Sequence, residues 1–221
     1  MKINVHAGHN PDGKTACGAV GLVKESTEAR KIAKEVIEQL KELDNTVYDC
    51  TVNDGKNQSD VLVKIVKKCN AHTVDLDVSI HLNSGRNDKK GDGDNAGVEV
   101  WVINSKSKAK PYAEKVCKAV SELGFDNRGV KYSDSLYFLK NTKAPAMLIE
   151  CFFVDDADDI KLYDYESMAS AIVKGITGKT VKKADDKKIY RVQVGAFSKK
   201  ENAEDMQKKL KKAGFDSTIV S

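Results

Sequence analysis

Residues 74–83, V-D-L-D-V-S-I-H-L-N, constrain the fold more than any other part of the chain, because apolar and polar residues alternate along their whole length. This period of two predicts a β-strand with one apolar and one polar face. His81 lies on the polar face, and the Asn83-Ser84-Gly85 run that follows predicts the end of the strand.

Two other short apolar runs also end close to residues that can do chemistry. Residues 2–5 lead through Ala7 and Gly8 to His9, and residues 146–149 end at Glu150. Catalytic and binding groups of open α/β sheets gather beyond the carboxyl ends of the strands. We therefore expect His9, His81 and Glu150 to lie at one edge of a sheet, where such a set indicates a metal site.

Strand and helix patterns alternate through residues 1–177, which predicts an α/β domain. Helical spacing covers residues 25–43, 59–69, 111–123 and 160–177. Ser26 or Thr27 is the expected cap of the first helix, and Ser59-Asp60 that of the second. Further strands are expected at 46–51, 97–103, 135–139 and 146–150. Glu25 would then lie at a helix N-terminus that faces the edge of the sheet.

Composition excludes several classes of protein. The net charge of +4 over 221 residues is mildly basic and favours anionic partners, but no basic tract is interleaved with aromatics, so no nucleic-acid binding is expected. No apolar run approaches the length of a membrane span, so no membrane partner is expected. The five cysteines are odd in number and form no C-x-x-C pair, which argues against a disulfide framework. Polar residues follow Met1 closely, which predicts synthesis in the cytoplasm without a signal peptide.

The last part of the chain differs in composition from the first. Residues 178–188 are charged and poor in apolar residues, and they are predicted to form a linker. A strand at 189–194, a helix at 199–213 that Gly214 ends, and a strand at 215–220 are expected to follow. Such a β-α-β unit is too small to fold alone, so it needs a second copy, the first domain or further residues.

Four residues meet the needs of a zinc hydrolase. Zinc in such enzymes takes three protein ligands, commonly two His and one Glu, and leaves one position for water. A separate carboxylate can take the proton of that water and pass it to the leaving amine. The chain offers His9, Glu25 and His81 as ligands, with Glu150 as the acid/base.

The residues alone leave other interpretations open. His6 rivals His9 as a ligand, and Glu28 rivals Glu25. A glutamate at a helix start also simply favours the helix dipole. Glu150 is harder to explain without a function, because a carboxylate in an apolar run is costly to bury unless it is paired or functional.

The ordered set of motifs resembles the zinc-dependent N-acetylmuramoyl-L-alanine amidases of the amidase-3 type. The resemblance runs through most of residues 1–177, with His6 and Asn10 as departures from the usual Asp and Gly. Its anchors are G-H at 8–9, Glu25 before a helix, S-I-H-L-N at 79–83, N-R-G-V at 127–130 and P-A-M-L-I-E at 145–150.

This resemblance implies a twisted, mostly parallel six-stranded sheet flanked by helices. It implies zinc on His9, Glu25 and His81, with Glu150 as the catalytic carboxylate. The implied reaction hydrolyses the amide between N-acetylmuramic acid and L-alanine of peptidoglycan, on the cell wall after release from the cell. The alternatives are a zinc peptidase that cleaves within the stem peptide and a non-catalytic wall-binding protein.

Residues 189–221 resemble one half of a SPOR domain, on the R-V-Q-V-G-A-F-S run and the amphipathic helix after it. The resemblance implies binding to glycan strands stripped of stem peptides. A complete SPOR domain has two β-α-β halves. The presence of a single β-α-β half therefore predicts one of three things: a shortened sequence, weak binding to glycan strands, or a dimer in which two chains pair through this segment.

Overall fold

One six-stranded sheet organises residues 1–181 in the computed structural model, which describes residues 1–181 and 193–219. The chain divides into two units, Met1–Val181 and Lys182–Ser221. The strands are β1 (Lys2–Ala7), β2 (Thr46–Asp49), β3 (Leu76–Asn83), β4 (Val98–Val102), β5 (Asn127–Tyr132) and β6 (Ala146–Phe153).

The sheet is mostly parallel, as the resemblance implies. Its strand order is β2-β1-β3-β6-β4-β5, and only the β4–β6 pair is antiparallel. The register places His81 beside Glu150 and Glu150 beside Glu99. The predicted α/β fold with six strands is therefore confirmed, and the reversal of β4 brings a second carboxylate next to Glu150.

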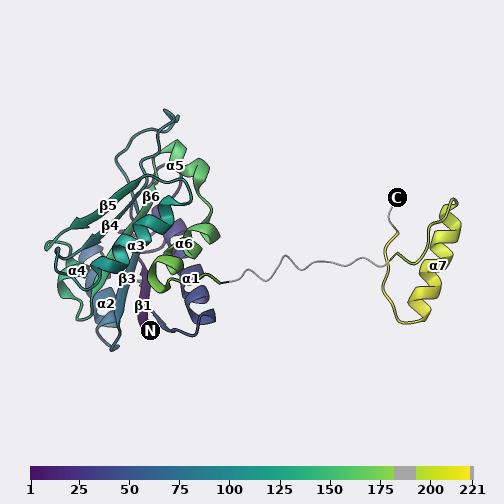
Figure 1. The fold of residues 1–221 in the computed structure, drawn as a ribbon, viewed down its shortest axis with the longest axis horizontal. Helices are drawn as coiled ribbons and strands as arrows, with labels where there is room; N and C mark the ends of the chain where they lie inside the picture. Colours follow the sequence, from purple (N-terminus) through teal and green to yellow (C-terminus); the bar gives the residue numbers. More distant parts are fainter. Residues whose placement is uncertain (182–192, 220–221) are drawn as a thin grey trace. The chain divides into compact units, whose positions relative to one another are not determined.

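Helices cover both faces of the sheet (Figure 1). The first face packs against α1 (Glu25–Glu42), α3 (Lys110–Ser121) and α6 (Tyr165–Thr177). The second face packs against α2 (Gln58–Cys69) and α4 (Tyr137–Asn141). The short helix α5 (Ala157–Leu162) follows β6.

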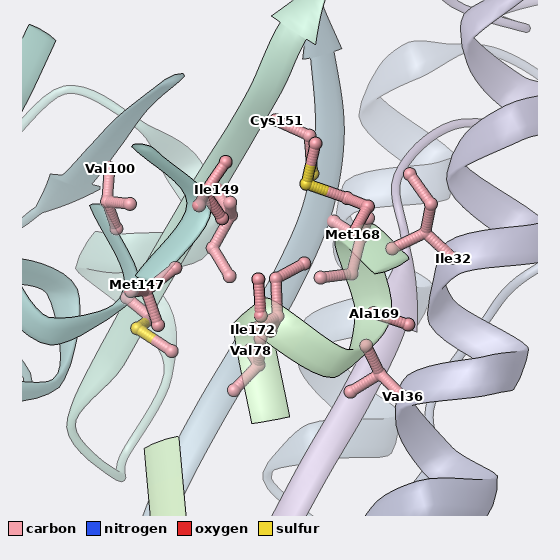
Figure 2. Close-up of a cluster of buried hydrophobic side chains, with 14 of the residues drawn as sticks. Ile32, Val36, Val78, Val100, Met147, Ile149, Cys151, Met168, Ala169 and Ile172 are labelled. Atoms are coloured by element: carbon pink, nitrogen blue, oxygen red, sulfur yellow. The ribbon is translucent and has the colours of Figure 1, made fainter. Parts of the chain in front are cut away.

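The alternation along each strand decides what each face carries. On β3, Leu76, Val78 and Ile80 belong to the first face, in a core cluster together with α1, α3 and α6. Figure 2 shows this cluster, where Met168 and Ile172 of α6 meet Ile149 of β6. The other side chains of the same strands face α2 and α4, so the chemically capable residues and the main core lie on opposite faces.

Three expectations about helices and strands are wrong. The predicted strand at 135–139 is the helix α4, which buries Phe138 and Leu139 in the second cluster. The predicted helix at 160–177 is two helices, because Asp164 caps a new one by accepting a hydrogen bond from the Ser167 N–H. Strand β6 continues to Phe153, so Glu150 lies within a strand and not at its end.

The expected helix caps are also wrong. Lys24, and not Ser26 or Thr27, is the N-cap of α1, and its side chain makes no capping hydrogen bond. Asn57 caps α2, and its side chain accepts a hydrogen bond from Asp60 N at 2.9 Å.

The second unit contains one described helix, α7 (Lys200–Lys212), close to the predicted bounds. Residues 215–219, which the sequence predicted as strand, have no strand pairing. The predicted strand at 189–194 and linker at 178–188 lie partly outside the described residues. None of the described helices is long and apolar enough to cross a bilayer.

Replacement of Gly175 by alanine tests the packing of α6 on α3. A Cβ at this position would lie 2.6 Å from the Val116 Cα, where the backbone cannot move aside. Helix propensity alone would favour alanine by about 1 kcal/mol, but overpacking costs roughly 1–3 kcal/mol. We expect Gly175→Ala to lower the free energy of unfolding in urea, whereas Val63→Ala at an exposed position of α2 should change it by less than about 0.5 kcal/mol. A more stable Gly175→Ala variant would contradict the packing.

Candidate metal centre and catalytic site

His9, Glu25 and His81 meet at one edge of the sheet. His9 follows β1, Glu25 is the first residue of α1, and His81 lies in β3. Their ligand atoms all lie within 4.8 Å of one another. The Glu25 Oε1 lies 3.1 Å from His9 Nε2 and 3.0 Å from His81 Nδ1, so one carboxylate oxygen contacts both imidazoles.

Two glycines leave room for this meeting. A Cβ at Gly8 would overlap the His81 ring, and a Cβ at Gly18 would collide with Glu25. Gly18 also has a φ of +80°, in the left-handed region that favours glycine. Both positions therefore need glycine for the three candidate ligands to approach.

The backbone of His9 is held in an uncommon conformation. Its φ is +63°, which is sparsely populated by residues with a side chain. Arg30 of α1 fixes this turn, because its guanidinium donates to the carbonyl oxygens of His9 at 2.9 Å and Val52 at 3.0 Å. A strained residue held by such a network is typical of a functional site.

Glu25 is held as a charged group although it is buried. Burial disfavours its ionised form, but hydrogen bonds with His81 and then His9 outweigh burial and leave the pKa of Glu25 well below its usual range. The backbone N–H groups of Ala19 and Leu82 also donate to its two oxygens, at 2.8 and 3.3 Å.

This arrangement fits a zinc ion. Two imidazoles and one carboxylate are a common ligand set of catalytic zinc, and ligands bound tetrahedrally at about 2.0–2.1 Å lie roughly 3.3 Å apart. The observed separations of 3.0 and 3.1 Å are close to that spacing. The N–H donors on Glu25 would orient it as a ligand, as outer contacts do in metal sites.

Glu150 lies beside this group without being part of it. It pairs with His81 across β3 and β6, and its Oε2 atom is buried with no hydrogen-bond partner among the described residues. Burial, followed by the charges of Glu25 and Glu99, raises the pKa of Glu150 to about 8. A partly buried carboxyl with a strongly raised pKa next to a metal-binding group is a candidate acid/base.

Glu99 is a buried carboxylate that the sequence analysis missed. It pairs with Glu150 across β4 and β6, and Arg128 Nε donates to its Oε2 at 2.9 Å. Asn83 Nδ2 and Trp101 Nε1 donate to its Oε1, at 3.0 and 3.1 Å. The signal was available, because Glu99 interrupts the apolar strand V-E-V-W-V in the way that Glu150 interrupts its own.

The rival ligands lie outside the group. Glu28 contacts Lys31 and the Tyr163 hydroxyl. His6 is buried against the Phe138 ring with a centroid separation of 4.7 Å, and burial lowers its pKa to about 3. Both therefore have structural surroundings of their own.

A second acidic group joins Asp88, in the loop after β3, to Asp156 and Asp158 at the start of α5. Its oxygens already accept backbone N–H groups of that loop, such as those of Gly91, Ala96 and Gly93, and Lys161 pairs with Asp158. These contacts give the group a role in ordering the loop.

Comparisons with known proteins show the family to which the chain is similar. Residues 3–178 match the N-acetylmuramoyl-L-alanine amidase family, and residues 167–221 match the SPOR domain. The catalytic domain of an endolysin targeting Clostridium difficile has a similar structure, with a TM-score of 0.72 and 26% identity, covering 82% of this chain and 99% of that one.

Two relatives illustrate how the chain lengths compare. A sporulation-specific N-acetylmuramoyl-L-alanine amidase of Bacillus subtilis is 25% identical over 230 residues, which cover 100% of this chain and 84% of that protein. A 38.4 kDa protein of Clostridium perfringens is 34% identical over 86% of this chain and 53% of its own length, so this chain spans about half of that relative. The match over residues 3–178, together with the shared fold, shows that the chain belongs to the N-acetylmuramoyl-L-alanine amidase family and carries a C-terminal SPOR segment.

Proposed function

We propose that this protein hydrolyses the amide between N-acetylmuramic acid and L-alanine in peptidoglycan, with zinc as its cofactor and Glu150 as its acid/base. One observation carries the proposal. The ligand atoms of His9, Glu25 and His81 lie within 4.8 Å of one another, and Glu150 lies beside His81 on the neighbouring strand. The family membership supports the choice of bond. The wall after release from the cell is the proposed place of action.

His9, Glu25 and His81 are the proposed ligands. A zinc ion held there supplies Lewis-acid polarisation of the amide carbonyl, acidifies the attacking water and favours the ionised form of a nearby carboxyl. Glu25 contributes a carboxylate that stays ionised without the metal, and the two imidazoles contribute nitrogen ligand atoms.

Glu150 moves the proton in this proposal. Its Oε2 has no hydrogen-bond partner within residues 1–181 and 193–219, so it is free to accept the proton of the attacking water. As the new C–O bond forms and the C–N bond breaks, the same oxygen gives that proton to the nitrogen of L-alanine. The products are a free lactyl carboxyl group and a peptide with an L-alanine N-terminus.

The SPOR match supports binding of the C-terminal segment to wall glycan. Pairing of two chains through this segment is part of the proposal, because four of its large apolar side chains are exposed. These are Val194, Phe197, Phe215 and Ile219.

Removal of the acid/base tests the catalytic assignment. We expect Glu150→Gln to lower the rate of peptide release from purified peptidoglycan by roughly 10²- to 10⁴-fold, because the amide side chain cannot move the proton. A chelator should abolish the wild-type activity and zinc should restore it. Mass spectrometry should find a peptide that starts with L-alanine beside intact muramic acid. A cut within the stem peptide would instead identify a peptidase, and full activity of Glu150→Gln would remove Glu150 from the mechanism.

The raised pKa of Glu150 predicts a pH-dependent stability of the chelated protein. The folded state keeps a proton that the unfolded state releases between about pH 4.5 and 8, so wild-type stability falls across this window as pH rises. Glu150→Gln lacks this loss. Relative to wild type, the variant should gain at least about 1 kcal/mol of unfolding free energy between the ends of this window, since one pKa unit is worth about 1.4 kcal/mol. Denaturant titrations at the two ends of the window measure the difference, and a constant difference would contradict the burial of a proton at Glu150.

Binding of the whole chain to wall glycan tests the role of the C-terminal segment. Sedimentation with glycan strands stripped of stem peptides should retain both the wild type and the Glu150→Gln variant, since binding there needs no catalysis. Analytical ultracentrifugation should give the mass of a dimer. Failure to sediment would remove the glycan-binding role, and a monomer mass would remove the pairing.

A further inference from the structure

Arg128 brings a positive charge to the row of polar residues beside the candidate metal centre. His81, Glu150 and Glu99 are register neighbours across β3, β6 and β4. Arg128 of β5, the next strand, continues this row, because its Nε donates to Glu99 Oε2 at 2.9 Å. Neighbouring strands lie about 5 Å apart, so the guanidinium contacts a side chain that is one strand spacing from Glu150.

An irregularity in β5 directs the Arg128 side chain. The residues that pair with β4 pass from Asn127 directly to Gly129, so Arg128 is an extra residue opposite one step of β4. Gly129 has a φ of +78°, which favours glycine, and its N–H donates to Asn127 Oδ1 at 3.0 Å. A β-bulge of this kind re-aims a side chain, and here it turns Arg128 toward Glu99.

The guanidinium of Arg128 has one edge bound and one edge open. Its Nε donates to Glu99, and its Cζ lies 5.0 Å from the centroid of the Phe153 ring. On the outer edge, Nη1 makes a long contact of 3.5 Å with the Ala96 carbonyl oxygen, and Nη2 has no hydrogen-bond partner in the part of the chain that the structure describes. The Arg128 side chain is 40% exposed, so a ligand can reach this edge. Two parallel N–H groups held in one plane fit a carboxylate.

Arg128 also lines an open cleft of about 540 Å³ between the loop after β3 and the start of β5. Its lining includes Arg86, Asp94 and Asp126. Arg86 is already engaged, because it contacts Asp92 at 2.7 Å and Asp156 at 3.5 Å. Asp94 and Asp126 form no ion pair within the described residues. The cleft therefore offers one open cationic edge and two carboxylates, which suits a ligand that carries both signs of charge.

We propose that this cleft binds the stem peptide beyond the bond that is cut, with Arg128 holding the free α-carboxylate of the second stem residue. This subsite rests on the proposed amidase function. The second residue is a D-glutamate joined to the next residue through its side chain, so its α-carboxylate is free unless it is amidated. Two residues of extended chain span at most about 7 Å, which brings this carboxylate from Glu150 to the guanidinium beside Glu99.

The third stem residue accounts for the acidic part of the cleft. It is a diamino acid whose second amino group is positively charged when free. The peptide therefore presents a carboxylate and then an ammonium group as it leaves the scissile bond. Asp94 and Asp126 are the carboxylates that this ammonium group meets in the proposal.

A pair of substrates tests the carboxylate contact. One is N-acetylmuramoyl-L-alanyl-D-glutamyl-L-lysine with a side-chain-linked glutamate, and the other is its D-isoglutamine form, in which a neutral carboxamide replaces the α-carboxylate. With zinc bound, the wild type should have a kcat/KM roughly 5-fold higher for the carboxylate form, the effect of a partly exposed ion pair. In Arg128→Ala this ratio should fall to about 1, because the variant and the carboxamide remove the same contact. A wild-type ratio of about 1, or an unchanged ratio in Arg128→Ala, would overturn the subsite.

The ratio of the two substrates separates binding from a merely structural role of Arg128. Loss of Arg128 leaves Glu99 without its ion pair, and we expect this to lower the rate on both substrates alike. Arg128→Lys keeps the charge without the planar fork, so its ratio should lie between those of Arg128→Ala and wild type. Lys115→Ala, at an exposed position of α3 on the other side of the sheet, should keep the wild-type ratio. Thermal unfolding checks that each variant is folded.

Acetylation of the lysine side chain tests the two aspartates. Calorimetric titration into the zinc-loaded Glu150→Gln chain should show that the acetylated peptide binds at least about twofold more weakly than the free one, the lower range for an exposed ion pair. The difference should vanish when Asp94→Asn and Asp126→Asn are combined with Glu150→Gln. Equal binding of both peptides to the Glu150→Gln chain would overturn the ammonium contact.

Kinetics and titration together separate failure of this subsite from failure of the proposed function. If the zinc-loaded wild type cleaves the muramoyl–alanine bond equally fast in the carboxylate and carboxamide substrates, the subsite is wrong and the amidase stands. If the wild type does not cleave that bond, the proposed function is wrong, and titration of the two substrates with and without Arg128→Ala still measures the carboxylate contact. Equal affinities in that titration would then overturn the subsite as well.

Discussion

The contact of one buried carboxylate oxygen with two imidazoles is the interaction on which the functional edge of this protein depends. Glu25 reaches His9 and His81 from the start of α1, and backbone N–H groups fix both of its oxygens. Because the Glu25 carboxyl stays ionised within the protein, the candidate ligand set carries its negative charge before a metal ion binds. Preorganisation of this kind reduces what metal binding must reorder.

The reversal of one strand shapes the electrostatics around that group. With β4 antiparallel to β6, Glu99 stands directly opposite Glu150. Arg128 pairs with Glu99, while Glu150 Oε2 has no hydrogen-bond partner among the described residues, and burial together with the charges of Glu25 and Glu99 raises the pKa of Glu150 to about 8. The two carboxyl groups on adjacent strands thus differ in their surroundings: Glu99 is ion-paired, and Glu150 can exchange a proton near neutral pH.

The sequence predicted those parts of the site that follow from local pattern. Alternation in residues 74–83 predicts a strand with one apolar and one polar face, and the structure places His81 opposite the face that carries Leu76, Val78 and Ile80. Glu25 was predicted at a helix start because Glu25-Ser26-Thr27 precedes the helical spacing of apolar residues that begins at Ile32, and the structure begins α1 at Glu25. The group of His9, Glu25 and His81 was expected from the order of strands and helices, and the structure brings these residues together.

Parts that depend on distant contacts could not be predicted. Residues 135–139 are apolar enough for a strand or a helix, and packing of Phe138 against α2 and the sheet decides for the helix. The pairing of Glu99 with Glu150 depends on which strand neighbours β6, which no local pattern reveals. The hold of Arg30 on the His9 carbonyl joins residues 21 positions apart and has no sequence signature. The site therefore emerges from topology as much as from motif.

The division of the sheet into two faces explains how the chain tolerates so strained an edge. Three features of this edge each lower the stability of the fold by an amount on the order of 1–3 kcal/mol. They are the left-handed backbone conformation of His9, the burial that raises the pKa of Glu150, and the buried atoms of His6 and Ser79 that lack a hydrogen-bond partner among the described residues. The same strands bury Val78 and Ile149 on their other face, in the continuous core formed with α1, α3 and α6. Each strand thus stabilises the fold through one set of alternate residues and carries the site through the other. A one-residue slip of β3 would exchange the two sets, and so the alternation that fixes the core also fixes the direction in which His81 points.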